Sequence, residues 1–161
     1  MNRAKTRLVA QAAGAQGADA VEAVAGDLRT WADADGAGFD AVLLDAPCSG
    51  TGVLAKRADL RWSQSPERTA DLLRLQDDLL DAAARHVRPG GRLVYATCSL
   101  ERDENDARVD AFLERHGGWR LDPVGDRVPP EMLDGPVYRA LPHAHGTDGA
   151  FAARLVRIPT P

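Results

Sequence analysis

The two cysteines of this chain follow two apolar runs and lie fifty residues apart. Cys48 stands in DAPCSGTG, just after the run that ends at Asp45, and Cys98 stands in YATCS, just after a second run. A thiolate is a strong nucleophile, whereas an ordinary free cysteine is a small buried hydrophobe. Because both thiols follow the ends of predicted strands, we expect them to face one cleft.

Asp45 is the acidic residue at the end of the first apolar run. A lone aspartate at such a place often caps the turn that follows it. Here Pro47 fixes the next turn, and Gly50 and Gly52 allow a ligand to approach the backbone closely. We therefore expect the Asp45 carboxyl group to hydrogen-bond the polar edge of a ligand.

Three further groups of polar residues have two interpretations each. Asp27 follows a predicted strand and either contacts a ligand or caps the next helix. Lys56, Arg57 and Arg61 follow the DAPCSGTG loop and either contact phosphate groups or form a solvated surface. The two histidines in PHAHG (residues 142–146) have the spacing of metal ligands, but no third ligand accompanies them, so we expect no metal site.

The candidate residues must be positioned by helices and strands, and the sequence predicts that these two kinds of element alternate. The predicted order is helix 4–13, strand 20–24, strand 39–45, helix 66–87, strand 92–96, helix 104–115, loop 123–149 and strand 150–158. Ser65 is expected to cap the long helix, and RPGG (residues 88–91) to end it and turn into the next strand. The run 39–45 lacks alternation, which predicts a strand buried on both faces.

This alternation predicts an α/β sheet with right-handed crossovers. Ligands of such sheets bind beyond the carboxyl ends of the strands. Residues 26–27, 45–48 and 97–99 all follow predicted strands and are therefore expected at that edge.

The composition sets broad limits on function. The chain has 161 residues, 44% of them hydrophobic, which suits one domain with a real core. No apolar run approaches the length of a membrane span, and the N-terminus lacks the apolar region of a secretory signal, so we expect a cytoplasmic protein with reduced thiols. The net charge of −4 does not suggest a large electrostatic footprint on nucleic acid.

Three phrases together carry a resemblance to a known family. DAPCSGTG, YATCS with ENDARVDAFL, and LPHAHGTDGAFAARL resemble the Sun-type RNA (cytosine-5-)methyltransferases, the bacterial rRNA methyltransferase family. An amino-group methyltransferase would have Asn/Asp-Pro-Pro-aromatic where this chain has Asp-Ala-Pro-Cys. The resemblance implies a class I S-adenosylmethionine-dependent methyltransferase with a Rossmann-like doubly wound α/β sheet. It also implies an RNA substrate, with rRNA favoured over tRNA, and a monomeric full-length protein.

The resemblance assigns roles to the candidate residues. Cys98 would add to C6 of the target cytosine, which makes C5 nucleophilic toward the methyl group, and Cys48 would assist release of the covalent intermediate. Asp45 would hydrogen-bond the base and, with Pro47, border the cofactor site, while Asp27 would contact the cofactor near its adenine. RNA contacts are expected at Lys56, Arg57 and Arg61.

The chain also departs from the family pattern. It has no glycine-rich cofactor loop, no acidic residue to hold the cofactor ribose and no N-terminal RNA-binding extension. We therefore expect residues 1–161 to be the C-terminal portion of one catalytic domain, without its first two strands, so that strand 39–45 has an unpaired edge. The alternatives are a non-catalytic remnant that at most binds RNA or a partner, and a cysteine hydrolase, for which no histidine is placed to pair with Cys98.

Overall fold

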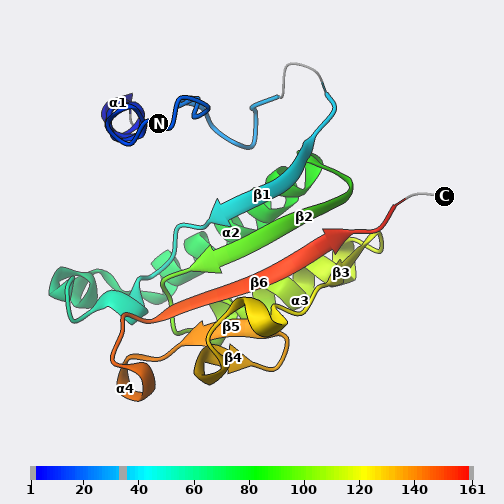
Figure 1. Ribbon diagram of the computed structural model, residues 1–161. Coiled ribbons are helices and arrows are strands. Elements are labelled where there is room, and N and C mark those ends of the chain that lie inside the picture. The colour runs from blue at the N-terminus through cyan, green and yellow to red at the C-terminus, as the bar shows by residue number, and fades with distance from the viewer. Residues whose placement is uncertain (1–2, 33–35, 160–161) are drawn as a thin grey trace. The chain divides into compact units, whose positions relative to one another are not determined.

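Figure 1 shows the computed structural model of the protein, which describes residues 3–32 and 36–159. The chain divides into two compact units, Met1–Ala32 and Asp33–Pro161. The first unit begins with helix α1 (Arg3–Ala15), which confirms the first predicted helix. Gly17 adopts a φ of 67°, and the Ala18 amide donates to the Ala13 carbonyl at 2.9 Å, so the helix ends in a left-handed turn.

The strand predicted for residues 20–24 is wrong. Residues 21–27 form no regular element, and the side chains of Val21 and Val24 are exposed. A strand exists only where its backbone groups pair with a neighbour, and no described strand pairs with this segment. A short apolar sequence alone therefore did not suffice to form a strand here.

The second unit is built on one mixed sheet. Its strands follow the order β1-β2-β6-β5-β4, and β3 also pairs with β6. Only β1 and β2 run parallel; the other pairings are antiparallel, as the arrowheads in Figure 1 show for β2 and β6. The strands are β1 (Phe39–Asp45), β2 (Val87–Thr97), β3 (Trp119–Leu121), β4 (Leu133–Asp134), β5 (Val137–Ala140) and β6 (Ala150–Arg157).

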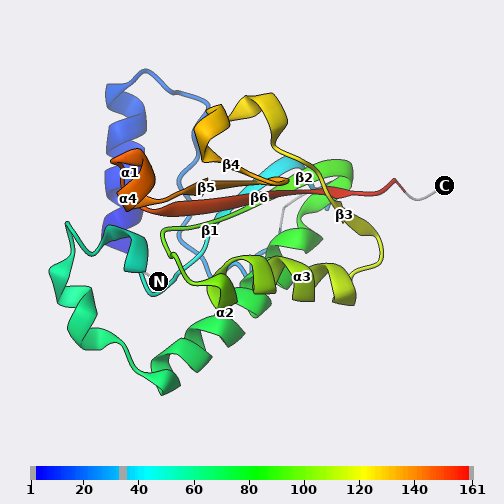
Figure 2. The ribbon, with the colours of Figure 1, turned by 90° about the horizontal axis from the view of Figure 1, so that it is seen from below.

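Two helices cover one face of this sheet, as Figure 2 shows. Helix α2 (Pro66–Arg85) connects the parallel strands, and the Ser65 hydroxyl caps it by accepting from the Arg68 amide at 3.2 Å. Helix α3 (Asp106–Arg115) buries Val109 and Phe112. Both helices confirm their predictions. Behind them the core includes the fully buried side chains Leu80, Leu93, Tyr95, Phe112, Phe151 and Leu155.

Strand β1 lies at an edge of the sheet, which corrects the prediction of burial on both faces. Val42 and Leu44 point inward, while Leu43 is 69% exposed. Since β2 is its only partner among the described strands, the other edge of β1 is unpaired, as expected. Residues 88–91 also differ from the prediction, because they form an irregular part of β2 opposite Asp40 rather than a separate turn, and α2 already ends at Arg85.

The segment 123–149, predicted as a loop, contains a β-hairpin. Strands β4 and β5 extend the sheet beside β6, and a short helix, α4 (Pro142–His145), follows them. The two strands of the hairpin are too short to show a two-residue period of apolar side chains. The five prolines of residues 123–149 obscure the pattern further. Strand β6 confirms its prediction, because Phe151, Ala153 and Leu155 are buried on one face.

Two 3₁₀ segments, η1 (Thr51–Val53) and η2 (Ala58–Ser63), lie between β1 and α2. None of the described helices has the length and apolarity that a membrane crossing requires.

Candidate active site

The two cysteines meet at the carboxyl ends of the parallel strands. Their Sγ atoms lie 3.4 Å apart, and both thiols are free and half-buried. The pairing of Asp45 with Ala96 in the sheet brings the two following loops together. The two thiols therefore lie together, as expected; that they face a cleft, and their chemical roles, remain predictions.

Cys48 is a neutral thiol at ordinary pH. Burial, and after it the hydrogen bond with Cys98, raises the pKa of the Cys48 thiol to about 12. A protonated thiol is a hydrogen-bond donor and a poor nucleophile. Cys48 is therefore suited to assist the sulfur atom beside it rather than to attack a substrate.

We expect Cys48 to resist alkylation in the folded protein. With its pKa at about 12, it should react with iodoacetamide at about pH 8.5 roughly a thousandfold more slowly than an unperturbed cysteine, because so little thiolate is present. The rate should rise about tenfold per pH unit up to about pH 11. Peptide mapping by mass spectrometry resolves the two cysteines, and the guanidinium-unfolded protein is the control. A rate that levels off below about pH 10 would contradict the raised pKa.

Glu104 is a fully buried carboxyl group that joins the two cysteine loops. Ser49, which follows Cys48, donates to it from its amide at 2.8 Å and also from its hydroxyl group. The hydroxyl group of Ser99, which follows Cys98, donates at 2.5 Å. The Gln76 amide of α2 adds a donor at 3.1 Å. One side chain thus fixes the residue after each cysteine.

A second set of hydrogen bonds orders the loop after β2. The Thr97 hydroxyl group donates to the Asn105 side chain at 2.6 Å, and the Asn105 amide donates to the Ser99 carbonyl at 2.9 Å. The Tyr95 hydroxyl group donates to the Glu104 carbonyl at 2.6 Å. Glu104 and Asn105 were not among the predicted site residues. Both lie in ENDARVDAFL, one of the phrases on which the family resemblance rests, and that phrase could have pointed to them.

Gly52 brings the backbones of the site into direct contact. Its amide donates to the Cys98 carbonyl at 2.9 Å, and its carbonyl accepts from the Gly149 amide at 2.8 Å. A Cβ atom at position 52 would lie 2.6 Å from the Gly149 oxygen and 2.7 Å from the Cys98 oxygen. The close approach predicted for a ligand at Gly52 is therefore made by the protein's own loops. Gly50 is needed for another reason, because its φ of 72° is left-handed.

Asp45 lies at the end of β1 with an exposed side chain. Its carboxyl group makes no hydrogen bond or ion pair with any residue that the structure describes. The Pro47 carbonyl accepts from the Gln76 amide at 2.9 Å, which fixes the turn between Asp45 and Cys48. The carboxyl group is thus held at the edge of the cysteine site with its acceptors free for a ligand.

Asp27 belongs to the first unit, whereas both cysteines belong to the second. Its carboxylate accepts from the Arg29 amide and guanidinium group at 2.7–3.0 Å, and these hydrogen bonds lower its pKa to about 2. It begins a turn, accepting at its carbonyl from Thr30 and Trp31, rather than capping a helix. Its cofactor contact remains a prediction.

The three basic residues predicted to contact RNA lie on or beside the 3₁₀ segments. Lys56 pairs with Asp148 at 2.7 Å, and Arg57 pairs with Asp59 at 2.9 Å. Arg61 is exposed and has no ion-pair partner within the described part of the chain.

The histidines of PHAHG lie in α4. His145 accepts from the Leu141 amide through Nδ1 at 2.8 Å, which closes that turn. Residues 3–32 and 36–159 contain no group of three side chains that could hold a metal ion.

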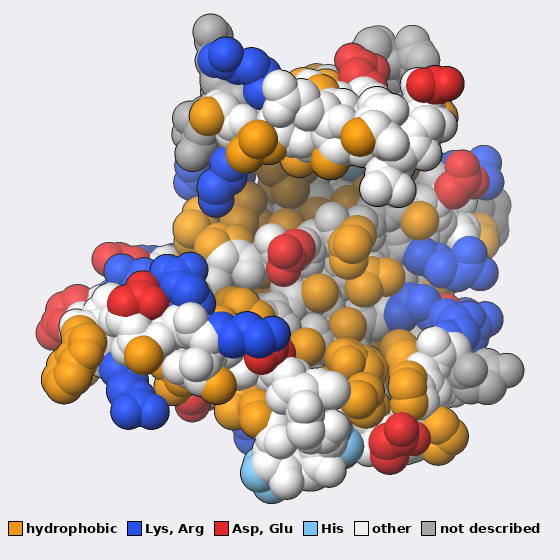
Figure 3. Space-filling model, turned by 60° about the vertical axis from the view of Figure 1, so that its left-hand side comes forward, with side chains coloured by type: hydrophobic (Ala, Val, Ile, Leu, Met, Phe, Trp, Pro, Cys, Tyr) orange, Lys and Arg blue, Asp and Glu red, His pale blue; other side chains and the backbone are white. Residues whose placement is uncertain are grey.

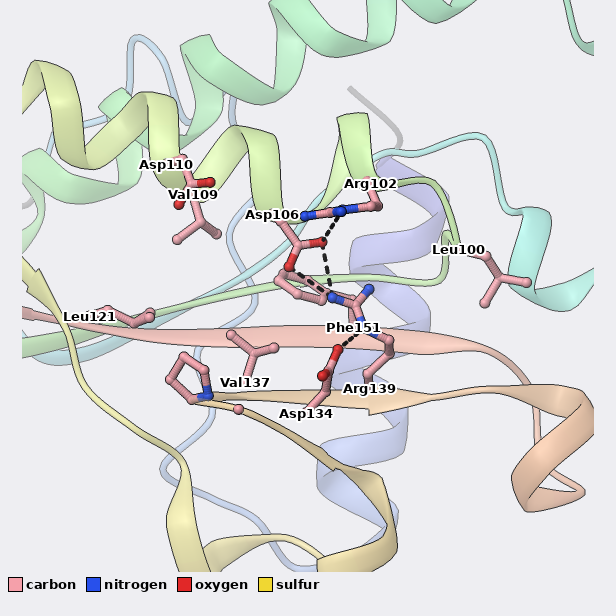
Figure 4. Close-up of a pocket in the computed structure, with 12 residues that line it drawn as sticks. Leu100, Arg102, Asp106, Val109, Asp110, Leu121, Asp134, Val137, Arg139 and Phe151 are labelled. Carbon is pink, nitrogen blue, oxygen red and sulfur yellow. Dashed lines mark hydrogen bonds and ion pairs between the residues drawn. The ribbon is translucent and has the colours of Figure 1, made fainter.

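A pocket of about 620 Å³ lies between α3 and the β4–β5 hairpin (Figure 4). Arg139 dominates it: the guanidinium group pairs with Asp106 at 2.8 Å and Asp134 at 2.6 Å, and lies 5.1 Å from the Phe151 ring centroid. These contacts occupy the polar groups of Arg139, Asp106 and Asp134 within the protein. We interpret the Arg139 contacts in this pocket as the interactions that hold the β4–β5 hairpin against α3.

Comparison with known proteins assigns this arrangement to a family. The sequence pattern of 16S rRNA methyltransferase RsmB/F matches residues 1–156. The chain belongs to this family. The resemblance seen in the two cysteine motifs is thereby confirmed, and the family is one of methyltransferases.

Relatives of this RsmB/F chain include ribosomal RNA small subunit methyltransferase B of Erwinia tasmaniensis, 42% identical over 119 residues, which are 74% of this chain and 26% of that protein. Putative methyltransferase Rv1407 of Mycobacterium tuberculosis is 45% identical over 123 residues, which are 75% of this chain and 27% of that protein. The chain thus spans about a quarter of the length of the curated relatives it matches.

Two solved structures share the fold of the RsmB/F chain. PH0851 has a TM-score of 0.85 at 35% identity and covers 96% of this chain and 35% of its own. NSun6 from Pyrococcus horikoshii, solved with SFG, has a TM-score of 0.81 at 30% identity, with 99% of this chain and 40% of its own covered. These likenesses confirm the Rossmann-like α/β methyltransferase fold.

Proposed function

We propose that the protein carrying this chain methylates C5 of a cytosine in RNA, with ribosomal RNA as the favoured substrate, through a covalent adduct between the Cys98 sulfur and C6 of the base. The observation that carries this proposal is the pair of free thiols 3.4 Å apart at the carboxyl ends of β1 and β2. The family membership and the motif around each cysteine support it.

The methyl donor in this proposal is S-adenosylmethionine, which supplies an electrophilic methyl group when bound. NSun6 was solved with SFG, an analogue of this cofactor. The residues present fit such a ligand at one point, because the exposed Asp45 carboxyl group has free acceptors beside the turn at Pro47. Asp45 would also hold the polar edge of the cytosine, and Asp27 would contact the cofactor from the first unit.

Cys98 would form the bond to C6 as a thiolate. Addition at C6 makes C5 electron-rich enough to accept the methyl group, and loss of the C5 proton and of the thiolate then restores the ring. The target base must leave its stack to reach the half-buried sulfur.

Cys48 would act on the leaving sulfur. Because its thiol is protonated and lies 3.4 Å from Cys98, it can donate a hydrogen bond to the thiolate that departs from C6. A donor at this place stabilises the leaving group and speeds breakdown of the adduct.

We therefore expect Cys48→Ala to accumulate a protein–RNA adduct, because addition still occurs while release is slowed. The measurement is a denaturing gel of the protein that carries this chain, incubated with S-adenosylmethionine and a labelled substrate RNA. The wild-type protein should show little slow-migrating product, and the Cys48→Ala/Cys98→Ala double variant should show none. An adduct that survives in the double variant would refute the assignment of Cys98.

The same gel separates the alternative functions. A non-catalytic chain that only binds RNA or a partner forms no covalent product in any variant, and a cysteine hydrolase forms none that depends on RNA.

A further inference from the structure

The 3₁₀ segment η2 is attached to the loop that carries Cys48. The Gln64 side-chain amide, just after η2, donates to the Ser49 carbonyl at 3.0 Å and to the Leu60 carbonyl at 3.1 Å. The Leu60 side chain packs on Gly50 so closely that a Cβ atom there would lie 2.7 Å from it. Both ends of the stretch 60–64 are thus fixed to residues adjoining Cys48.

Trp62 lies between these two attachments, and its side chain is 89% exposed. Tryptophan is usually largely buried, so an indole ring left in water on a fixed segment is unusual. Two residues of backbone span at most about 7 Å, which keeps the Trp62 Cα atom within that distance of the Cα atoms of Leu60 and Gln64. The ring is therefore carried on a short segment that is fixed to the loop after Cys48.

The surroundings of Trp62 are basic, although the chain as a whole is acidic. Residues 51–65 contain Lys56, Arg57 and Arg61 but only one acidic residue, Asp59. Figure 3 shows Lys and Arg side chains beside hydrophobic and acidic ones on the lobe that this segment forms. Lys56 and Arg57 are paired, so Arg61, next to Trp62, is the cation of this segment without a partner in the described structure.

We infer that Trp62 is a stacking platform for an unpaired base of the RNA strand next to the target cytosine, with Arg61 contacting the adjoining phosphate. This inference rests on the proposed function. Extrusion of the target base leaves the neighbouring bases without a stacking partner, and an exposed ring on the segment fixed to the Cys48 loop can stack on one of them.

The residues around the ring favour RNA over a protein partner. A protein interface would surround the tryptophan with further apolar side chains. Here the adjoining residues are Arg61 and Ser63, and Leu60 is turned onto Gly50. An isolated aromatic face beside a free guanidinium group matches the stacking and phosphate contacts of single-stranded RNA.

The test is the affinity of the protein that carries this chain for a fluorescein-labelled, single-stranded RNA of about twelve nucleotides with one central cytosine, measured by fluorescence anisotropy. We expect Trp62→Ala to weaken binding about 5- to 100-fold, the range that loss of one stacked base produces. Trp62→Phe should stay within about threefold of the wild type, and Trp62→Leu should bind as weakly as Trp62→Ala. Trp31→Phe, in the other unit, is the matched control for loss of a tryptophan.

Two results would overturn the inference. They are unchanged affinity of Trp62→Ala, and equal affinity of Trp62→Leu and Trp62→Phe, which would indicate an apolar contact without stacking. Methyl transfer is measured on the same samples. If Trp62→Ala keeps both its RNA affinity and its methyl transfer, only the role of Trp62 is refuted. If the wild-type protein neither binds nor methylates RNA, the proposed function is refuted and this inference with it.

Discussion

Replacing Cys98 by alanine is expected to reduce methyl transfer by about a thousandfold or more, because C5 of cytosine is not nucleophilic until a thiolate has added at C6. Incorporation of labelled methyl groups from S-adenosylmethionine into the substrate RNA measures the loss. Cys98→Ser should be nearly as inactive, since a hydroxyl group ionises far less readily than a thiol.

RNA binding separates lost chemistry from a lost fold. Cys98→Ala changes a half-buried side chain by one atom, so its affinity for the RNA should remain within about threefold of the wild type. Cys48→Ala is the matched variant, because the two thiols lie 3.4 Å apart and only one of them is proposed to attack. Normal methyl transfer by Cys98→Ala would eliminate it as the nucleophile.

Glu104→Ala is expected to lower the free energy of unfolding by about 3 kcal/mol. Its carboxyl group is fully buried and accepts hydrogen bonds from Ser49, Ser99 and Gln76, and removing it leaves buried donors without an acceptor. Urea denaturation measures the change. Glu101→Ala is the control, because that exposed side chain three residues away should change stability by less than about 0.5 kcal/mol.

Glu104 is also expected to position the cysteines. Glu104→Gln keeps the size of the side chain and one acceptor oxygen, so it should retain more stability than Glu104→Ala while turning an amide donor toward other donors. Its methyl transfer should then fall further than its RNA affinity. If both Glu104 variants unfold at the wild-type urea concentration, the carboxyl group does not hold the two loops.

Local sequence determines the elements closest to the site. The Ser65-Pro66 pair predicts the start of α2 because a hydroxyl acceptor and a fixed φ act within one turn. The apolar run 39–45 predicts a strand, and the two cysteine motifs predict that their loops meet. Each of these features depends on neighbours in the chain or on the rule that parallel strands share an edge.

Other features depend on partners far away in the sequence. Residues 20–24 were predicted as a short strand, yet no described strand pairs with them, and propensity cannot supply a partner. The β4–β5 hairpin is stabilised by β6 and by the contacts of Arg139, which no local pattern reveals. From the sequence alone, Glu104 is indistinguishable from an exposed acidic residue before a helix. Its burial becomes visible only when the two cysteine loops are folded together.

The contact between Gly52 and Gly149 has a consequence for how the site can evolve. The loops after β1 and β2 and the start of β6 meet there through main-chain atoms, without a side chain between them. Rotamer changes of side chains therefore cannot adjust the spacing of these backbones; only movement of a whole loop can. Substrate preference is free to vary in the side chains around the site, while the spacing of the loops that carry the two cysteines is inherited as a property of the backbone.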